Sequence, residues 1–355
     1  MMRAWLRPDA VVAWATTGLC ILLILFPTEA LQSSTRGLAV WWEVLFPALF
    51  PFFVLSELLL GFGIVHFLGK LLDPFMRPLF RLPGTGGFVV AMGYVSGYPV
   101  GARLTAQLRE QRLVTRIEGE RLVAFTTTSD PIFLIGAVSI GFFHNAALAP
   151  LLAAAHYGSG LLLGFLMRFH GWRDAETAES TIHTSGSRGR SRLQEAFHAM
   201  HAARLLDGRP FGRLLHDAVQ SALRLMIVVG GLVVFFSTIM EMLHQSGALS
   251  SLSALLQSLF GIMGLPKPLT DAVVFGLFEV TLGSRSAGSA GSALVHQAAI
   301  AAWVLSWAGL SVHAQVASIL SRTDLRYGPF LAARFIHGIM AMLLVYMLWR
   351  TLGPH

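Results

Sequence analysis

Apolar residues gather in long runs along the chain, and shorter polar connections separate these runs. A helix that spans the hydrocarbon core of a bilayer needs about 20 largely apolar residues. Runs near that length cover residues 10–26, 41–62, 122–143, 147–167, 218–240, 297–320 and 327–349. The pattern therefore predicts an all-α integral membrane protein with about seven spanning helices. For the first run, a cleaved signal peptide is the alternative.

Two further stretches, residues 84–108 and 269–295, begin apolar and are rich in glycine and polar residues in the middle. Basic residues lie on both flanks of the first stretch, so both of its ends are expected in the cytoplasm. The loop before the second stretch, residues 244–268, has Lys267 as its only Lys or Arg and is expected outside. We therefore expect two re-entrant hairpins that enter from opposite faces of the membrane. Such backbone is tolerated where protein or a watery cavity covers it.

The order of span, hairpin, broken span and span occurs twice, with opposite orientation once the basic loops are assigned to the cytoplasm. This is an inverted-topology repeat, which is characteristic of secondary transporters. The expected parts are an N-terminal helix and loop (1–39), a first repeat (40–167), a basic cytoplasmic linker (168–213) and a second repeat (214–350). Within the linker, residues 176–192 are predicted to be flexible and residues 193–206 to form an amphipathic surface helix.

Composition supports a membrane protein, because 54% of the residues are hydrophobic and only 13% are charged. Ordinary soluble domains carry about 25% charged residues. The net charge of +7 comes from arginines in the connections, which indicates cytoplasmic anchoring and not nucleic-acid binding. The single cysteine, Cys20, allows no internal disulfide.

The sequence "TTTSDP", residues 126–131, interrupts the third apolar run. Asp130 before Pro131 is typical of a helix N-cap followed by proline at the first helical position. One half-helix is therefore expected to end near Thr127 and another to begin at Pro131. A half-helix N-terminus and nearby hydroxyls are suited to binding an anion. The alternative is a proline kink whose hydroxyls satisfy the freed carbonyls. The candidate binding residues here are Thr126, Thr127, Thr128, Ser129 and Asp130.

Polar residues at three other places complete the candidate substrate site. The first hairpin tip contributes Ser96, Gly97 and Tyr98, the second contributes Glu279, Ser284, Arg285 and Ser286, and the sixth run contributes Ser311, His313 and Gln315. A guanidinium at membrane depth needs an anion, so Arg285 is expected to bind a ligand carboxylate. The alternatives are an internal Glu279–Arg285 pair and, for His313, a satisfied packing role.

No motif for an enzyme, a cofactor or a metal centre is present in the sequence. It has no nucleophile elbow, no phosphate-cradling loop and no metalloprotease helix motif. We therefore expect a protein that binds or moves a solute without catalysing a reaction.

Several segments resemble the sporulation integral membrane protein YlbJ family, which carries paired nucleoside-recognition (Gate) domains. They include "GGFVVAMGYVSGYPVGARLTA", "IEGERLVAFTTTSDPIFLIGAVSIGFF", "FGLFEVTLGS" and "SVHAQVASILSRTDLRYGPFLAARFIHG". The resemblance implies an architecture similar to concentrative nucleoside transporters. It also implies a role in moving dipicolinic acid from the mother cell across the outer forespore membrane. Asp130 replaces an Asn of the family pattern, which leaves the charge at this place open.

The leading hypothesis is a multi-pass transporter of a small carboxylate, with dipicolinate implied by the resemblance. A nucleoside transporter and a non-transporting membrane scaffold for spore maturation are the alternatives. The expected partners are an anionic small molecule and the lipid bilayer, with no nucleic acid, no cofactor and no metal. A coupling ion or proton and a homo-oligomer are left open.

Overall fold

The computed structural model describes residues 8–173, 191–264 and 266–354, and this part of the chain is helical without strands. The first half comprises α1 (Pro8–Leu25), α2 (Pro27–Val40), the π-helical turn η2 (Trp41–Leu45), α3 (Phe46–Gly61), α4 (Ile64–Phe80), α5 (Thr85–Ser96), α6 (Val100–Glu110), α7 (Arg116–Thr126), the π-helix η3 (Phe133–Phe142), η4 (Ala146–Leu148) and α8 (Ala149–Met167). The second half comprises α9 (Arg192–Asp207), α10 (Phe211–Gln245), α11 (Ala248–Met263), η5 (Lys267–Leu269), α12 (Thr270–Phe278), α13 (Val280–Gly288), α14 (Leu294–Trp307), α15 (Gly309–Leu320) and α16 (Tyr327–Leu352).

The expected all-α integral membrane fold is confirmed. Among the described residues, 4 segments are long and apolar enough to cross a membrane, or up to 6 if each of two bent helix pairs counts as one span. The run at 122–143 is not among them, because its two half-helices, α7 and η3, are each too short to cross alone. The bent pairs are α1 with α2 and α3 with α4, whose axes turn by 104° and 83°.

The stretches at 84–108 and 269–295 each form two short helices joined by a tight turn. In the first, α5 and α6 are joined at residues 97–99, and in the second, α12 and α13 are joined at Glu279 alone. The second pair crosses so closely that a β-carbon on Gly283 would lie 2.7 Å from the backbone nitrogen of Gly276. Glycine at this crossing lets the two helices touch through their backbones. The face of the membrane from which each hairpin enters stays a prediction.

The two halves repeat the same order of elements in antiparallel fashion. Each half has a hairpin, a broken helix and a closing helix: α5–α6, α7–η3 and α8, then α12–α13, α14–α15 and α16. Glu120 at the start of the first broken helix binds Arg326, which follows the second broken helix. At the other end, a β-carbon on Gly288 of the second hairpin would lie 2.6 Å from the carbonyl oxygen of Phe142, the last residue of η3. Each broken helix therefore ends near the start of the other broken helix.

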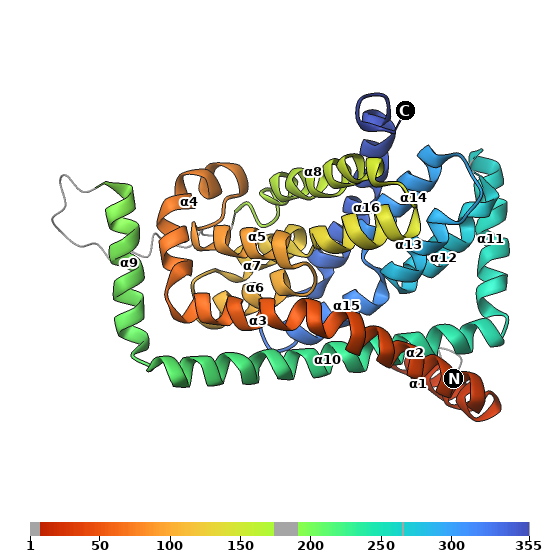
Figure 1. The fold of residues 1–355 in the computed structure, drawn as a ribbon, viewed down its shortest axis with the longest axis horizontal. Coiled ribbons are helices and arrows are strands. Elements are labelled where there is room, and N and C mark those ends of the chain that lie inside the picture. The colour runs from red at the N-terminus through yellow and green to blue at the C-terminus, as the bar shows by residue number, and fades with distance from the viewer. Residues whose placement is uncertain (1–7, 174–190, 265, 355) are drawn as a thin grey trace.

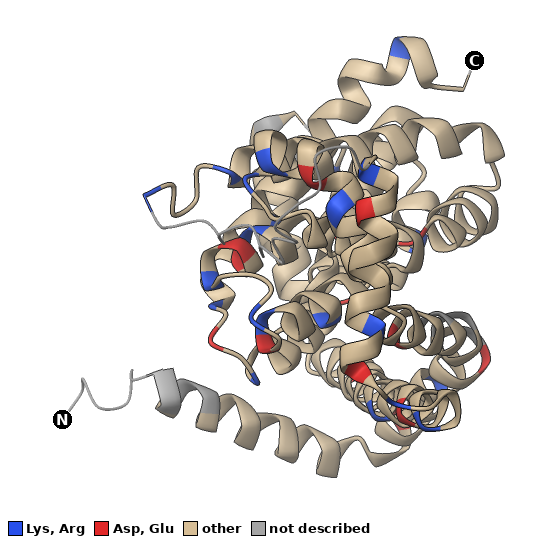
Figure 2. Cartoon of the chain, turned by 90° about the vertical axis from the view of Figure 1, so that its left-hand side faces the viewer, with Lys and Arg blue, Asp and Glu red and all other residues tan. Residues whose placement is uncertain are grey.

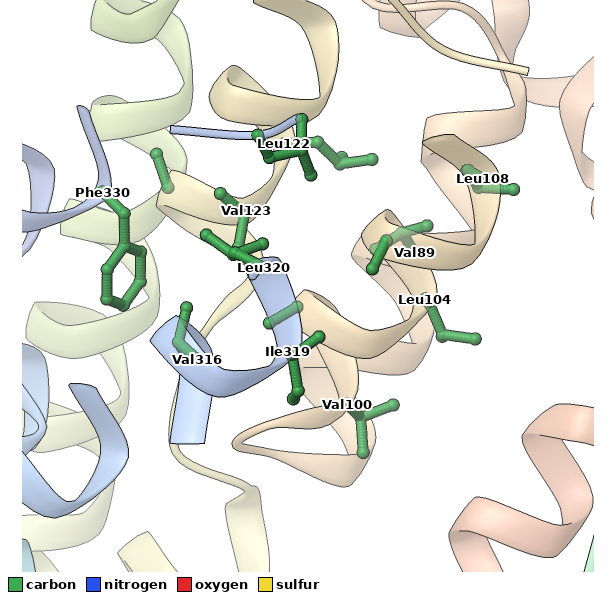
Figure 3. Packing of buried hydrophobic residues seen from close by; sticks show 14 of the residues in the cluster. Val89, Val100, Leu104, Leu108, Leu122, Val123, Val316, Ile319, Leu320 and Phe330 are labelled. Carbon is green, nitrogen blue, oxygen red and sulfur yellow. The ribbon is translucent and has the colours of Figure 1, made fainter. Parts of the chain in front are cut away.

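The apolar core connects the first hairpin to the second repeat. Val89, Val100 and Leu104 of the hairpin belong to one buried cluster with Leu122 of α7 and Val316 of α15 (Figure 3). Lipid is as apolar as these side chains, so close van der Waals packing, and not the hydrophobic effect, holds such helices together in a bilayer. This packing holds the first hairpin against both broken helices.

The surface helix predicted at residues 193–206 is confirmed as α9, which begins with a capping box at Ser191 and ends at Gly208 with φ +62°. It packs against α4 at one end of the long axis, and α11 lies at the opposite end (Figure 1). Charged residues gather at the α4–α9 end (Figure 2). This arrangement agrees with opposite sides for the linker and for the segment 244–268, which was expected to be a loop but is largely the helix α11. Most of the predicted flexible stretch at 176–192 lies outside the described residues.

Candidate functional site

The first helix break has the geometry expected from its sequence. The helix α7 ends at Thr126, and the helical backbone resumes at Pro131. The backbone N–H of Phe133 donates to Oδ1 of Asp130 at 2.8 Å, so Asp130 caps the new half-helix. The prediction of a break with an aspartate cap is confirmed. The Asp130 carboxylate therefore occupies the half-helix N-terminus where an anionic ligand was expected to bind.

The second hairpin carries an equivalent cap. Glu279 is in extended backbone between α12 and α13, with φ −147° and ψ 129°. Its Oε2 accepts a hydrogen bond from the backbone N–H of Leu282 at 2.7 Å. Two carboxylates, Asp130 and Glu279, are therefore each tied to a half-helix N-terminus, one in each repeat.

The second broken helix turns at Ala308 and Gly309, which both have positive φ (76° and 72°). The helix resumes at once after this turn, so Ser311, His313 and Gln315 are helical. A β-carbon on Gly309 would lie 2.9 Å from the backbone nitrogen of Glu279. The second hairpin tip therefore sits directly on the second break, and glycine makes that approach feasible.

A cavity of about 520 Å³ opens between the hairpin tips, the helix breaks and the helices α2 and α10. Seven of its polar lining residues come from the hairpins and the broken helices: Tyr98, Asp130, Glu279, Thr281, Arg285, Ser311 and Gln315. Its volume falls within the range of about 300–1,000 Å³ that is usual for small-molecule sites. The fold thus brings six of the candidate residues, all of these except Thr281, to one cavity.

The two arginines of this cavity differ, because one forms an ion pair and the other does not. Arg36 of α2 and Glu241 of α10 form an ion pair at 2.9 Å. Arg285 lies on α13 with its side chain exposed, and within the described residues no carboxylate lies within 4.0 Å of it. The expected alternative, an internal Glu279–Arg285 ion pair, is absent from the described structure. Arg285 is therefore available to a ligand that enters the cavity.

The remaining candidate residues do not line this cavity. The hydroxyls of Thr126 and Thr127 donate to the carbonyls of Leu122 and Val123, the back-bonding expected for a simple kink. His313 is satisfied by the hydroxyl of Tyr327 at 2.6 Å and the carbonyl of Trp307 at 3.1 Å. The others that lie away from the cavity are Ser96, Gly97, Thr128, Ser129, Ser284 and Ser286.

The sequence analysis missed two parts of the region around the breaks. Ser33, Arg36 and Glu241 bound the cavity from α2 and α10, and the polar core behind it contains His156 and Arg334. The backbone N–H of Ser129 donates to Nε2 of His156 at 3.1 Å, so the imidazole is neutral and its Nδ1–H donates to Oγ of Ser306 at 2.8 Å. The presence of ionisable residues within apolar runs could have pointed to this core.

Tyr98 joins the two repeats beside the cavity. Its hydroxyl donates to the carbonyl oxygen of Leu305 in α14 at 2.6 Å. Leu305 lies three residues before the second break at Ala308. The first hairpin tip is thereby fixed to the broken helix of the other repeat.

Comparison with known proteins shows what the chain is similar to. The family described as "Gate: Nucleoside recognition" matches residues 42–169. The sporulation integral membrane protein YlbJ of Bacillus subtilis (strain 168) is 44% identical over 330 residues, which cover 93% of this chain and 80% of that protein. An uncharacterized protein of Alkalihalophilus pseudofirmus is 30% identical over 109 residues, 28% of this chain and 24% of that protein. A solved structure, that of a doubly substituted CNTnw in an outward-facing state, is 12% identical with a TM-score of 0.47, covering 98% of this chain and 87% of that one.

Proposed function

The chain belongs to the family of the sporulation integral membrane protein YlbJ, and on that premise we propose that it is a membrane carrier of a small carboxylate. Dipicolinic acid, moved across the outer forespore membrane, is the substrate and place that the family resemblance implies. The observation that carries the proposal is the cavity between the hairpin tips and the helix breaks, in which Arg285 has no carboxylate partner among the described residues.

The chemistry of the cavity supports a carboxylate ligand through one strong contact and several neutral ones. Arg285 offers a planar fork of donors that matches a carboxylate. The hydroxyls of Tyr98, Thr281 and Ser311 and the amide of Gln315 line the same space. Asp130 and Glu279 repel an anion, but each already accepts a backbone N–H, which spreads part of its charge into a half-helix.

A nucleoside is the second candidate substrate. The matched family is described by nucleoside recognition, and the carboxylates of Asp130 and Glu279 in the cavity could accept hydrogen bonds from ribose hydroxyls. A nucleoside carries no negative charge, so it would make no ion pair with Arg285. The two candidates therefore predict different roles for this arginine.

The test is uptake of radiolabelled solute by proteoliposomes that contain the purified full-length protein. We expect uptake of dipicolinate that unlabelled dipicolinate blocks and that uridine or adenosine does not block. Arg285→Gln should weaken binding by roughly tenfold or more, because hydrogen bonds to a charged group contribute about 1.5–3 kcal/mol. Arg322→Gln, at an exposed arginine in the α15–α16 loop, is the matched control and should transport normally.

Uptake of a nucleoside that is insensitive to Arg285→Gln would favour the second candidate. A well-folded protein that takes up neither solute, while a known carrier in parallel vesicles does, would favour a scaffold without transport activity.

A further inference from the structure

A buried arginine in α16 connects the two helix breaks. The side chain of Arg334 is fully buried. Its Nη1 donates to the carbonyl oxygen of Thr127 at 2.6 Å and more weakly to that of Ser306 at 3.4 Å, and its Nη2 donates to the carbonyl oxygen of Ala124. Ala124 lies in the last turn of α7, Thr127 is the residue directly after that helix, and Ser306 lies in the last turn of α14. One guanidinium therefore holds the C-terminal ends of both interrupted helices.

These carbonyl groups are the ones that lack partners in their own helices. The last four carbonyls of a helix have no intrahelical donor, and together they carry a partial negative charge. In transporters with broken helices, unwound carbonyls and half-helix C-termini commonly coordinate the coupling cation. Here the carbonyls of Ala124, Thr127 and Ser306 already bind a cation that belongs to the chain.

The surroundings of Arg334 offer it no carboxylate. Within the described residues, no Asp or Glu oxygen lies within 4.0 Å of this guanidinium, and no ion pair involves it. The ring of Phe330 lies beside it, with its centroid 5.6 Å from the guanidinium carbon. His156 is neutral by its hydrogen bonds, as described above. A desolvated cation must find compensation, and the helix-end carbonyls are what this fold supplies.

We propose that Arg334 is a built-in cation for both helix breaks, occupying the carbonyls that a bound metal ion would otherwise coordinate. The breaks therefore keep their geometry without Na⁺ or K⁺ at this place, and solute moves without a metal cation bound there. The part of this inference that concerns transport rests on the proposed function. The part that concerns the helix breaks does not.

The first test uses the unmodified protein and needs no transport. A cation that binds the folded state raises its thermal stability by mass action. We expect the thermal midpoint of the purified protein to change by less than about 1 °C when choline chloride replaces NaCl or KCl at equal ionic strength. A midpoint that rises with Na⁺ or K⁺ in a saturable manner would overturn the proposal.

The second test removes the guanidinium. Arg334→Ala should lower the midpoint by more than about 5 °C, and low-millimolar guanidinium or methylguanidinium should restore part of the loss. Arg334→Lys should fall between the two proteins, because an ammonium cannot reproduce the fork. Leu151→Ala is the matched control, since it opens a cavity at a fully buried aliphatic residue and should gain nothing from guanidinium.

Equal responses of Arg334→Ala and Leu151→Ala to guanidinium would contradict the assignment. Should Arg334→Ala not fold, the choline arm on the unmodified protein still decides the question. Dipicolinate uptake measured in NaCl and in choline chloride then adds the functional arm. Uptake that requires Na⁺ counts against the proposal. Absence of uptake in both salts counts against the proposed substrate, and the thermal midpoints then decide whether Arg334 acts as the built-in cation.

Discussion

Gly97 at the tip of the first hairpin lies against Asp130 at the first helix break. A β-carbon on Gly97 would lie 2.8 Å from the backbone nitrogen of Asp130 and 3.0 Å from its Oδ2. The second repeat has a similar contact with the roles exchanged: a β-carbon on Gly309, at the helix break, would lie 2.9 Å from the backbone nitrogen of Glu279, at the hairpin tip. In both repeats a glycine lets a hairpin tip rest directly on a helix break, so the position of each break depends on a hairpin.

This contact predicts that Gly97→Ala disturbs the first break. Gly97 has φ +73°, where a side chain costs about 1–2 kcal/mol, and the added methyl would also meet Asp130. We expect destabilisation of at least about 1 kcal/mol, seen as a lower thermal midpoint. Gly158→Ala is the control, because nothing lies within 4 Å of its added methyl in α8, and it should be neutral or stabilising. Equal stability of the two variants would show that the tip is not held as described.

Two tyrosines of the first hairpin should differ in the value of their hydroxyls. Tyr98 donates to the carbonyl of Leu305 at 2.6 Å, whereas the buried hydroxyl of Tyr94 has no hydrogen-bond partner in the described structure. Tyr98→Phe should cost about 1 kcal/mol of stability, and Tyr94→Phe should be neutral or stabilising. Thermal unfolding of the two variants side by side measures the difference. The reverse order of stability would be incompatible with the link between the hairpin and α14.

The cap at the first break predicts how Asp130 tolerates change. Asp130→Asn keeps an oxygen that accepts from Phe133, so its stability should stay within about 0.5 kcal/mol of the original. Asp130→Ala loses the cap and should cost about 1 kcal/mol. Asn also removes a negative charge from the cavity, which should tighten dipicolinate binding about fivefold, or about 1 kcal/mol. Weaker dipicolinate binding by Asp130→Asn would mean that the carboxylate itself contacts the ligand.

The Glu120 carboxylate lies outside the predicted spans and links the two repeats through its contact with Arg326; we call the contacts of Glu120 with Arg326 and His170 the latch. It is fully buried and accepts hydrogen bonds from Arg326 at 2.7 and 2.8 Å and from His170 at 2.7 Å. Glu120→Gln should cost about 1.5–3 kcal/mol, the usual value for hydrogen bonds to a charged group. Glu110→Gln, at an exposed position at the end of α6, is the control and should be neutral.

The same latch predicts a dependence of stability on pH. Burial acts to raise the pKa of Glu120, but hydrogen bonds from Arg326 and His170 outweigh it and hold the pKa below the ordinary value of 4.5. Its contribution is therefore complete above pH 4.5 and is lost as the pH falls through the lower pKa of the folded state. The difference in thermal midpoint between the original protein and Glu120→Gln should shrink on acidification. A constant difference from about pH 7 to about pH 3 would contradict this assignment.

The first break could be predicted from sequence because it is a local event. Proline removes a helical hydrogen bond, and the aspartate before it supplies a cap, so Asp130 and Pro131 suffice to locate the new half-helix. The helix–turn–helix form of both hairpins could be predicted because stretches that are glycine-rich and polar in the middle are poor spans, whereas their re-entrant course through the membrane stays a prediction. Both signals act within a few residues of the structure that they predict.

The far wall of the cavity and the polar core behind it depend on contacts between distant parts of the chain. Arg36 meets Glu241 across 205 residues, and Arg334 meets Thr127 across 207. Arg334 lies in an apolar run whose length alone indicated a span, so the hydropathy pattern did not single out this residue. A charge within an apolar run was the available signal. Its partners could not be predicted from the sequence, because they are backbone carbonyls, which every residue has.

Arg334 is the eighth residue of α16, and His156 is the eighth residue of α8. Both side chains reach the space between the breaks, one as a guanidinium and the other as a neutral imidazole. The helices of the two repeats thus mirror each other, but their charges do not. A carrier of perfect twofold symmetry would hold its inward-open and outward-open forms at equal free energy between identical solutions. For the proposed carrier, a cation on one repeat only predicts that these two forms differ in free energy, so that one orientation is preferred before any gradient acts.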